Sequence, residues 1–260
     1  MNSKTVVRVG LVIVLIWVAC MVFLPVSKMF DAEEFIDKKI RFSSVTGFWW
    51  RGVVNDLTVD YRAHRIDFGQ LNWQVDWRTL LSSRWCIKGI TSASKEAIST
   101  RFSACYRLFE NDFQIIDTVI NVNAKTLAQV SGVEIAGQWL VNIDSITIKN
   151  NRLVDIYGEA VWQRAQWHNG ESWFALGDIL STFDTSQQSA LMINTTDING
   201  PLQVELTTLL FTQQHQYKQQ NQQWKLKGFI EPYGQLPQSL TESLEFIASK
   251  IDGKRYYVEY

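Results

Sequence analysis

The sequence is poor in the residues that carry catalysis and metal binding. Its three histidines, His64, His168 and His215, stand in polar, turn-like surroundings without a cysteine, aspartate or second histidine at ligand spacing. It contains no nucleophile elbow, no phosphate-binding glycine loop and no HExxH zinc motif. Its acidic residues are scattered, and no pair can be argued to converge for acid–base chemistry. We therefore expect no enzymatic activity, no bound metal and no cofactor.

Proline, linker-like stretches and an excess of charge of one sign are also scarce. Four prolines and no Gly/Ser-rich segment leave no strong domain boundary in 260 residues. The formal net charge of −1 is spread evenly, which provides neither a basic face for nucleic acid nor an acidic tail. The composition argues against nucleic acid as a partner.

Long apolar runs are absent with one exception, near the N-terminus. Residues 9–26, VGLVIVLIWVACMVFLPV, carry no charge and approach the roughly 20 residues that a helix needs to cross a bilayer core. We predict a transmembrane helix over residues 9–27. A cleaved signal peptide is the alternative, but the run is longer than the usual signal-peptide core and no small-residue cleavage site follows it.

The charges on either side of this run predict its orientation. Lys4 and Arg8 precede it, whereas acidic residues within 31–34 follow it. Positive charge is retained on the cytoplasmic side of a membrane. We therefore expect residues 1–8 to stay in the cytoplasm and residues 28–260 to form a single exported domain.

Only three cysteines are present, and the predicted orientation separates them. Cys20 lies in the apolar run, where we expect a small apolar residue, with lipidation as the alternative. Cys86 and Cys105 lie in the exported part, where thiols oxidise. Their spacing fits neither a CxxC redox motif nor a zinc site. We predict a structural disulfide between neighbouring strands, with two unpaired buried thiols as the alternative.

Most of the chain alternates apolar and polar residues with the period of a β-strand. In QLNWQVDW, residues 70–77, this alternation puts Leu71, Trp73, Val75 and Trp77 on one face. Similar patterns recur in NDLTVDY, SITIKN, QVELTTLLF and WKLKGFI, with turn-forming residues between them. The chain is therefore expected to be mainly β, with an antiparallel sheet that has one buried face.

Two segments depart from this alternation. Within residues 239–253, apolar residues recur at helical spacing: Leu240, Leu244, Ile247 and Ile251. Ser239 and Glu242 form a capping box and Gly253 ends the pattern, which predicts a C-terminal amphipathic helix packed on the sheet. Residues 113–132 are predicted to form a strand followed by a short turn or helix.

Tryptophan is abundant, with 11 residues, and most of these rings are expected to fill the core. Trp49 and Trp50 are adjacent in VTGFWWRGVVNDLTV, at the start of a predicted strand. Because consecutive side chains of a strand point to opposite faces, both rings cannot enter one core. One of them is therefore expected to be on the other face.

Several glycines and tryptophans, a leucine pair, one alanine and one proline form a pattern shared with a known family. They are Gly47, Trp50 and Gly52 of GFWWRG, Trp73, Leu80 and Leu81 of LNWQVDWRTLL, Gly158, Ala160 and Trp162 of YGEAVWQ, and Pro237 and Gly253 around the C-terminal helix. On these residues the chain resembles protein N of the bacterial type II secretion system. It differs in Trp49, in the glutamine-rich tract 213–223, which we expect to form a hairpin loop, and in residues 177–188, interpreted as an insertion-like loop.

The resemblance implies one N-terminal transmembrane helix, followed along the chain by a curved β-sheet with an exposed apolar concavity. It implies an accessory inner-membrane component with a periplasmic domain, involved in the export of folded proteins across the outer membrane. Other inner-membrane secretion subunits and the bilayer are the implied partners. Trp50 then belongs to the core, which leaves Trp49 as a candidate contact to a partner or to lipid. Two alternatives stay open: a membrane-anchored lipid-binding or lipid-transfer protein with an apolar β-groove, and an anchored enzyme.

Overall fold

The computed structural model describes most of the chain beyond residue 38. The described residues are 12, 23–25, 39–61, 64–92, 98–107, 109–110, 112–150, 152–185, 190–211, 224–252 and 254–260. Gly253, the glutamine-rich tract 213–223 and nearly all of the predicted transmembrane segment 9–27 lie outside them. Within the described parts of the chain, no helix is both long enough and apolar enough to cross a membrane.

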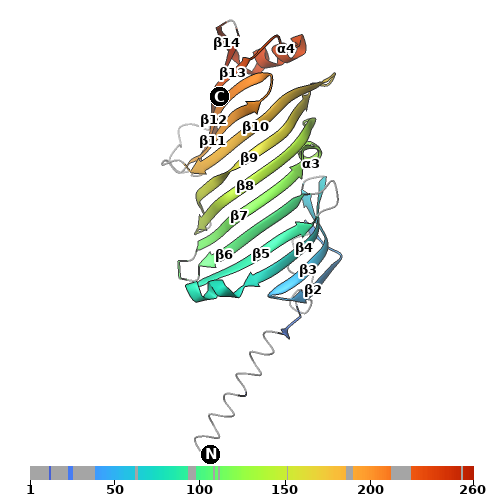
Figure 1. The fold of residues 1–260 in the computed structure, drawn as a ribbon, viewed down its shortest axis with the longest axis vertical. Helices are drawn as coiled ribbons and strands as arrows, with labels where there is room; N and C mark the ends of the chain where they lie inside the picture. The colour runs from blue at the N-terminus through green and yellow to red at the C-terminus, as the bar shows by residue number, and fades with distance from the viewer. Residues whose placement is uncertain are drawn as a thin grey trace, which may run out of the picture.

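One antiparallel sheet of 15 strands dominates the described chain (Figure 1). The strands are β1 (Ile40–Arg41), β2 (Ser44–Phe48), β3 (Arg51–Tyr61), β4 (His64–Asp76), β5 (Arg84–Ser92), β6 (Ser99–Arg107), β7 (Asp112–Asn123), β8 (Ile135–Lys149), β9 (Arg152–His168), β10 (Trp173–Thr185), β11 (Ala190–Asn199), β12 (Leu202–Phe211), β13 (Trp224–Pro232), β14 (Ser249–Asp252) and β15 (Arg255–Glu259). A 3-10 helix η1 (Trp77–Ser82) and two α-helices, α3 (Ala124–Ser131) and α4 (Gln238–Ile247), lie between strands. The prediction of a mainly β, antiparallel fold is confirmed.

The strands follow one another through the sheet almost in chain order. From β3 to β12, each strand pairs with the strand before it and the strand after it. Both β1 and β2 pair with β3, and at the other end β15 pairs with β13 and leaves β14 at the edge. Figure 1 shows the result as an open, twisted sheet that runs from β2 at one end to β14 and α4 at the other.

The register gives the sheet one apolar and one polar face. On five successive strands, Val75, Ile87, Ala104, Ile115 and Ile146 stand opposite one another and share a face. One residue away on the neighbouring strands, Gln74, Lys88 and Ser103 share the other face. The predicted alternation is therefore confirmed for Leu71, Trp73 and Val75, but Trp77 lies in η1 because β4 ends at Asp76.

Irregular residues interrupt this register at intervals. The pairing shifts between β3 and β4, between β6 and β7, and along both edges of β9. Asp56, Asp117 and Arg164 have φ values of 53°, 49° and 49°, in the left-handed region that non-glycine residues rarely adopt. Because a bulge bends its strand and increases the local right-handed twist, these positions contribute to the curvature of the sheet.

The described core is concentrated under α4 at the C-terminal end. Leu244 of α4 packs against Leu202, Val204, Ile230, Tyr256 and Val258 from β12, β13 and β15. Leu240 of the same helix is also buried. The prediction of a C-terminal amphipathic helix that packs on the sheet is confirmed for these two leucines.

The predicted end and cap of this helix are wrong. The chain after Ile247 turns into β14, so that Ile251 lies on an exposed strand instead of a fourth helical position. Pro237 occupies the N-cap and no side-chain hydrogen bond caps the helix, so no capping box forms. The amide of Gln238 instead donates to the Glu242 carboxylate at 2.9 Å, one turn along α4.

Two other segments test the sequence interpretation. Residues 113–132 form most of β7 followed by α3, as the sequence predicted. Residues 177–188 were expected to be an insertion-like loop, but β10 includes them up to Thr185 and pairs with both neighbours. The segment is therefore part of a strand, with shifts in its pairing on both edges near Gly177.

Candidate interaction surfaces

Among the described residues, much of the apolar face of the sheet has no second layer over it. This face carries a row of half-buried isoleucines: Ile115, Ile143, Ile156 and Ile193. Each of them lies beside residues of the neighbouring strands. In Figure 1 the strands follow one another along the long axis of the molecule. A continuous apolar surface of this kind is typical of a binding face, because exposed apolar area is costly in water.

A groove of about 830 Å³ lies where α4 meets this face. Its apolar lining includes Leu176, Ile179, Leu206 and Leu244. Glu171 and Glu242 also line it and add negative charge. Such a groove fits an extended apolar group, either an acyl chain or apolar side chains of another protein.

Three glycines of the sheet face aromatic rings on the next strand. Gly52 stands opposite Trp73, Gly89 opposite Phe102 and Gly158 opposite Phe183. In each pair, a Cβ added to the glycine would come within 2.3–2.7 Å of atoms of the ring. The missing side chain lets the ring lie flat against the sheet, so Gly52, Trp73 and Gly158 of the family pattern have structural roles.

The Trp49–Trp50 pair lies in the turn between β2 and β3, not in a strand. The backbone carbonyl of Trp49 accepts a hydrogen bond from the Trp73 indole at 3.2 Å, and that of Trp50 accepts one from the Val75 amide at 2.7 Å. Gly47, with a φ of 106°, lets the hairpin close because an added Cβ would come within 2.6 Å of the Arg51 carbonyl oxygen. Both tryptophan side chains are half-buried.

The two rings diverge from this turn. The Trp50 ring stacks on Phe48 with a centroid separation of 5.8 Å and an interplanar angle of 5°. The Trp49 ring packs edge-to-face against Trp77 of η1 at 5.3 Å. The two rings thus pack against different neighbours, and because they stand in a turn the argument from strand alternation does not apply to them. The core position of Trp50 and the role of Trp49 as a contact stay predictions.

Trp162, another residue of the family pattern, supports the middle of the sheet. Its ring stacks on Trp139 of the neighbouring strand at 5.2 Å, and its indole donates to the Ala136 carbonyl at 3.0 Å. Gly137 makes room for this arrangement, since a Cβ there would lie 2.9 Å from the Trp162 nitrogen. Trp162 of β9 thus contacts β8 through both its ring and its indole N–H, which indicates a structural role.

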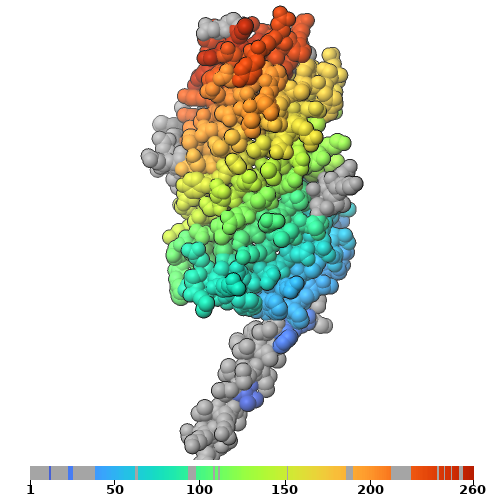
Figure 2. Space-filling view, in the orientation of Figure 1, coloured from blue at the N-terminus to red at the C-terminus, as the bar shows by residue number. Residues whose placement is uncertain are grey.

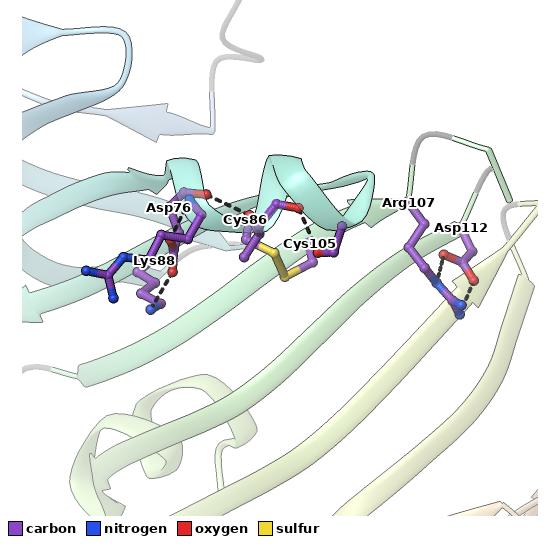
Figure 3. Close-up of a disulfide and its surroundings, with 9 residues drawn as sticks. Asp76, Cys86, Lys88, Cys105, Arg107 and Asp112 are labelled. Carbon is purple, nitrogen blue, oxygen red and sulfur yellow. Dashed lines mark hydrogen bonds and ion pairs between the residues drawn. A yellow bond between two sulfur atoms is a disulfide. The ribbon is translucent and has the colours of Figure 1, made fainter.

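Cys86 and Cys105 are joined in a disulfide between β5 and β6 (Figure 3). They stand directly opposite in the register, with their Cα atoms 4.0 Å apart, and both are buried. This is the arrangement that the sequence led us to expect, a disulfide between neighbouring strands. It fixes the start of β5, directly after η1, to the adjacent strand.

Charged groups flank this disulfide. The Asp76 carboxylate accepts a hydrogen bond from the Lys88 ammonium at 2.8 Å and one from the Arg78 amide at 3.2 Å (Figure 3). The hydrogen bond from Lys88 is the main reason that the pKa of Asp76 lies below its ordinary value. At the end of β6, the Arg107 guanidinium contacts the buried Asp112 carboxylate at two nitrogen–oxygen distances, 2.7 and 2.5 Å. The hydrogen bond to Asp112 raises the pKa of Arg107.

The structure brings together only part of the predicted pattern. Gly47, Trp50, Gly52 and Trp73 line one cleft of about 640 Å³ at the β2 end of the sheet. Gly158 and Trp162 lie several strands away on β9, and Pro237 lies at the start of α4, beside the larger groove. The pattern therefore marks separate structural points and no single site.

Sequence reasoning missed two exposed apolar side chains. Leu81 at the end of η1 is 94% exposed and Phe246 on α4 is 89% exposed. The sequence marked Leu81 as one of the leucine pair in the family pattern but gave no sign of its exposure. Phe246 stands among helical residues without sharing the apolar stripe.

No group of acidic, histidine or cysteine side chains in the described residues could hold a metal ion. His168 instead pairs with Glu134, with 2.5 Å between its Nδ1 and the carboxylate oxygen, and His64 is exposed. His215 lies outside the described residues.

Comparison with known proteins gives one family match. The model of the family described as type II secretion system (T2SS), protein N matches residues 38–258, which include every strand of the sheet except the last residue of β15. No curated protein and no solved structure matches the chain.

Proposed function

The chain belongs to the type II secretion system protein N family, and on this premise we propose that it is an accessory, non-enzymatic subunit of the inner-membrane part of that system. Family membership makes it a component of type II secretion, which implies contacts with other secretion subunits. In the proposal, residues 9–27 anchor it, residues 1–8 stay in the cytoplasm and residues 28–260 lie in the periplasm. There it contributes to the export of folded proteins across the outer membrane.

The observation that carries an interaction role is the uncovered apolar face of a single-layer sheet. A sheet of this size ordinarily buries its apolar face against a second layer. Among the described residues, the buried cluster with a second layer over it lies under α4, and another subunit is the proposed cover of the row from Ile115 to Ile193. The buried disulfide supports a periplasmic location, because disulfides persist in oxidising compartments.

The proposal is tested by photo-crosslinking in cells with the full chain. A photo-reactive residue at Leu206 reports on the apolar face, and one at Glu205, its neighbour on β12, reports on the polar face of the same strand. We expect another secretion subunit to be captured from position 206 and not from position 205. Recovery of the uncrosslinked chain as a free monomer from both positions, under gentle extraction, would contradict the proposal.

A second candidate function, lipid binding, is favoured by the groove under α4. Its volume of about 830 Å³ and its lining of Leu176, Ile179 and Leu206 suit an acyl chain. The same probe at Leu206 separates the two functions, because the mass of the adduct distinguishes a phospholipid from a polypeptide. Capture of phospholipid alone at this position would make lipid binding the better proposal.

A further inference from the structure

We infer that the end of the sheet formed by the β2–β3 turn and η1 rests on the surface of a membrane that contains anionic phospholipid. This inference depends on the membrane anchor of the proposed function. It concerns four apolar side chains, Trp77, Leu80, Leu81 and Trp85, and three arginines, Arg51, Arg78 and Arg84. We call these seven residues the η1 patch.

The apolar side chains of the η1 patch are exposed together. Trp77, Leu80 and Trp85 are each about two-fifths exposed, and Leu81 is 94% exposed. All four lie within nine consecutive residues, which include η1 and the first two residues of β5. Tryptophan at the headgroup level with leucine below it is typical of protein surfaces that enter the membrane interface.

The described residues at the end of the apolar run reach this part of the sheet. Pro25 forms an antiparallel bridge with Phe48 of β2, and the Phe23 ring packs edge-to-face against Phe48 at 6.2 Å. Residues 23–25 are the last part of the predicted transmembrane segment. If residues 9–27 span the bilayer, β2 must therefore lie at the membrane surface.

Aromatic contacts connect this point to the η1 patch. Phe48 stacks on Trp50, and the adjacent Trp49 packs against Trp77 of η1 at 5.3 Å. The end of the apolar run and η1 therefore both contact the β2–β3 hairpin, the first through Phe48 and the second through Trp49. In Figure 2, the cyan segment that contains η1 lies beside the blue strands at one end of the molecule, opposite α4.

The charge of the η1 patch favours anionic lipid as the partner. Arg51, Arg78 and Arg84 are exposed, and none of them forms an ion pair with another described residue. The nearby Asp76 carboxylate is already hydrogen-bonded to Lys88. Positive side chains beside apolar ones bind anionic headgroups, which reinforces the insertion of the apolar side chains.

The consequence is an upright sheet. With its η1 end on the membrane, the long axis in Figure 1 points away from the bilayer, and α4 with its groove lies at the far end. A single helix anchor leaves a domain free to tilt, whereas a second contact at the η1 patch restricts the tilt. The apolar face is then perpendicular to the membrane plane, where neighbouring subunits can contact it.

The test uses the full chain reconstituted in vesicles of phosphatidylethanolamine with phosphatidylglycerol. A photo-reactive residue replaces Leu81, and in a matched variant it replaces Phe246, which is similarly exposed but lies on α4 at the opposite end. Flotation of the vesicles measures the anchor independently, and mass spectrometry identifies each adduct. We expect phospholipid adducts at position 81 and none at position 246.

The lipid charge is varied in the same assay. Replacing phosphatidylglycerol by phosphatidylcholine, or introducing Arg51→Gln with Arg84→Gln, is expected to lower the yield of lipid adduct at position 81 by about threefold. Arg101→Gln with Arg152→Gln, two exposed arginines elsewhere in the sheet, should leave the yield unchanged.

The outcomes separate this inference from the proposed function. A chain that floats but gives no lipid adduct at position 81, or gives an adduct to a second copy of itself, overturns the inference and leaves the anchor intact. A chain that does not float overturns the anchor and the inference with it. Equal lipid adducts at positions 81 and 246 show a sheet that lies flat, which also contradicts the inference.

Discussion

The indole ring of Trp73 covers Gly52, its partner on the next strand, so closely that a Cβ on the glycine would lie 2.3 Å from two ring atoms. The same Cβ would lie 2.6 Å from the Thr46 carbonyl oxygen, which belongs to the backbone and cannot rotate away. Glycine is therefore needed at position 52 because there is no space for a Cβ atom, and not because the backbone there has a positive φ.

The Gly52→Ala substitution is expected to lower the free energy of unfolding by about 2 kcal/mol, the usual cost of overpacking. Denaturant unfolding of the purified protein, followed by tryptophan fluorescence, measures it. Gly234→Ala is the control, because an added Cβ there has no neighbour within 4 Å, and its effect should stay within about 0.5 kcal/mol. Equal stability of the two variants would contradict the tight Gly52–Trp73 contact.

Removal of the disulfide, by Cys86→Ser with Cys105→Ser, is expected to destabilise the protein. The pair closes a loop with a sequence separation of 19, for which the chain-entropy estimate is about 3 kcal/mol. Unfolding with and without reductant measures the loss in the unsubstituted protein, and Cys20→Ser serves as the control that keeps the pair. If reductant leaves the unfolding curve unchanged, the two thiols are not joined in the folded protein.

Substitutions on α4 should separate its buried side from its exposed side. Leu244→Ala removes a side chain that is 5% exposed and packed in the core cluster, and should cost about 3 kcal/mol. Phe246→Ala, two residues further on the same helix, should change stability by less than about 0.5 kcal/mol. A large effect of the Phe246 change would mean that α4 packs through a different side.

The pair of Asp76 and Lys88 predicts a specific dependence of stability on pH. Because Lys88 lowers the pKa of Asp76 in the folded protein, the pair stabilises the fold above the ordinary aspartate value of about 4. As the pH falls through the lower pKa of the folded state, Asp76 becomes protonated and this stabilisation is lost. The stability gap between the unsubstituted protein and Lys88→Met should therefore be constant near neutral pH and close in acid.

Unfolding curves over a range of acidic pH measure this gap. In an Asp76→Asn background, the Lys88→Met change should give a gap that does not vary with pH. A pH-dependent gap in that background would assign the effect to another carboxylate.

Hydrophobic alternation predicted the sheet because it depends only on neighbours along a strand. Leu71, Trp73 and Val75 share a face wherever their strand is placed, and the structure confirms it. Alternation does not show whether a second layer covers that face, since this depends on parts of the chain distant in sequence. The family resemblance implied an exposed apolar surface, but the structure was needed to locate it on the strands.

The errors at the ends of elements have local causes. Ile251 fits a helical stripe by spacing, but Asp252 and Gly253 are a dipeptide typical of hairpin turns, and the alternating residues on either side form β14 and β15. The β2–β3 turn was missed for the opposite reason. Trp49 and Trp50 occupy it without any of the usual turn residues, so only the glycines at 47 and 52 indicated a tight hairpin.

The nearly sequential order of the strands has a consequence for how the protein folds. Between β3 and β13, every strand finds its partner in the segment just before it, so the cost of closing long loops is never incurred. A chain that becomes available from its N-terminal end can add one hairpin at a time to the growing edge. Two strands depart from this order, because β1 pairs with β3 beyond β2, and β15 pairs with β13 across α4 and β14.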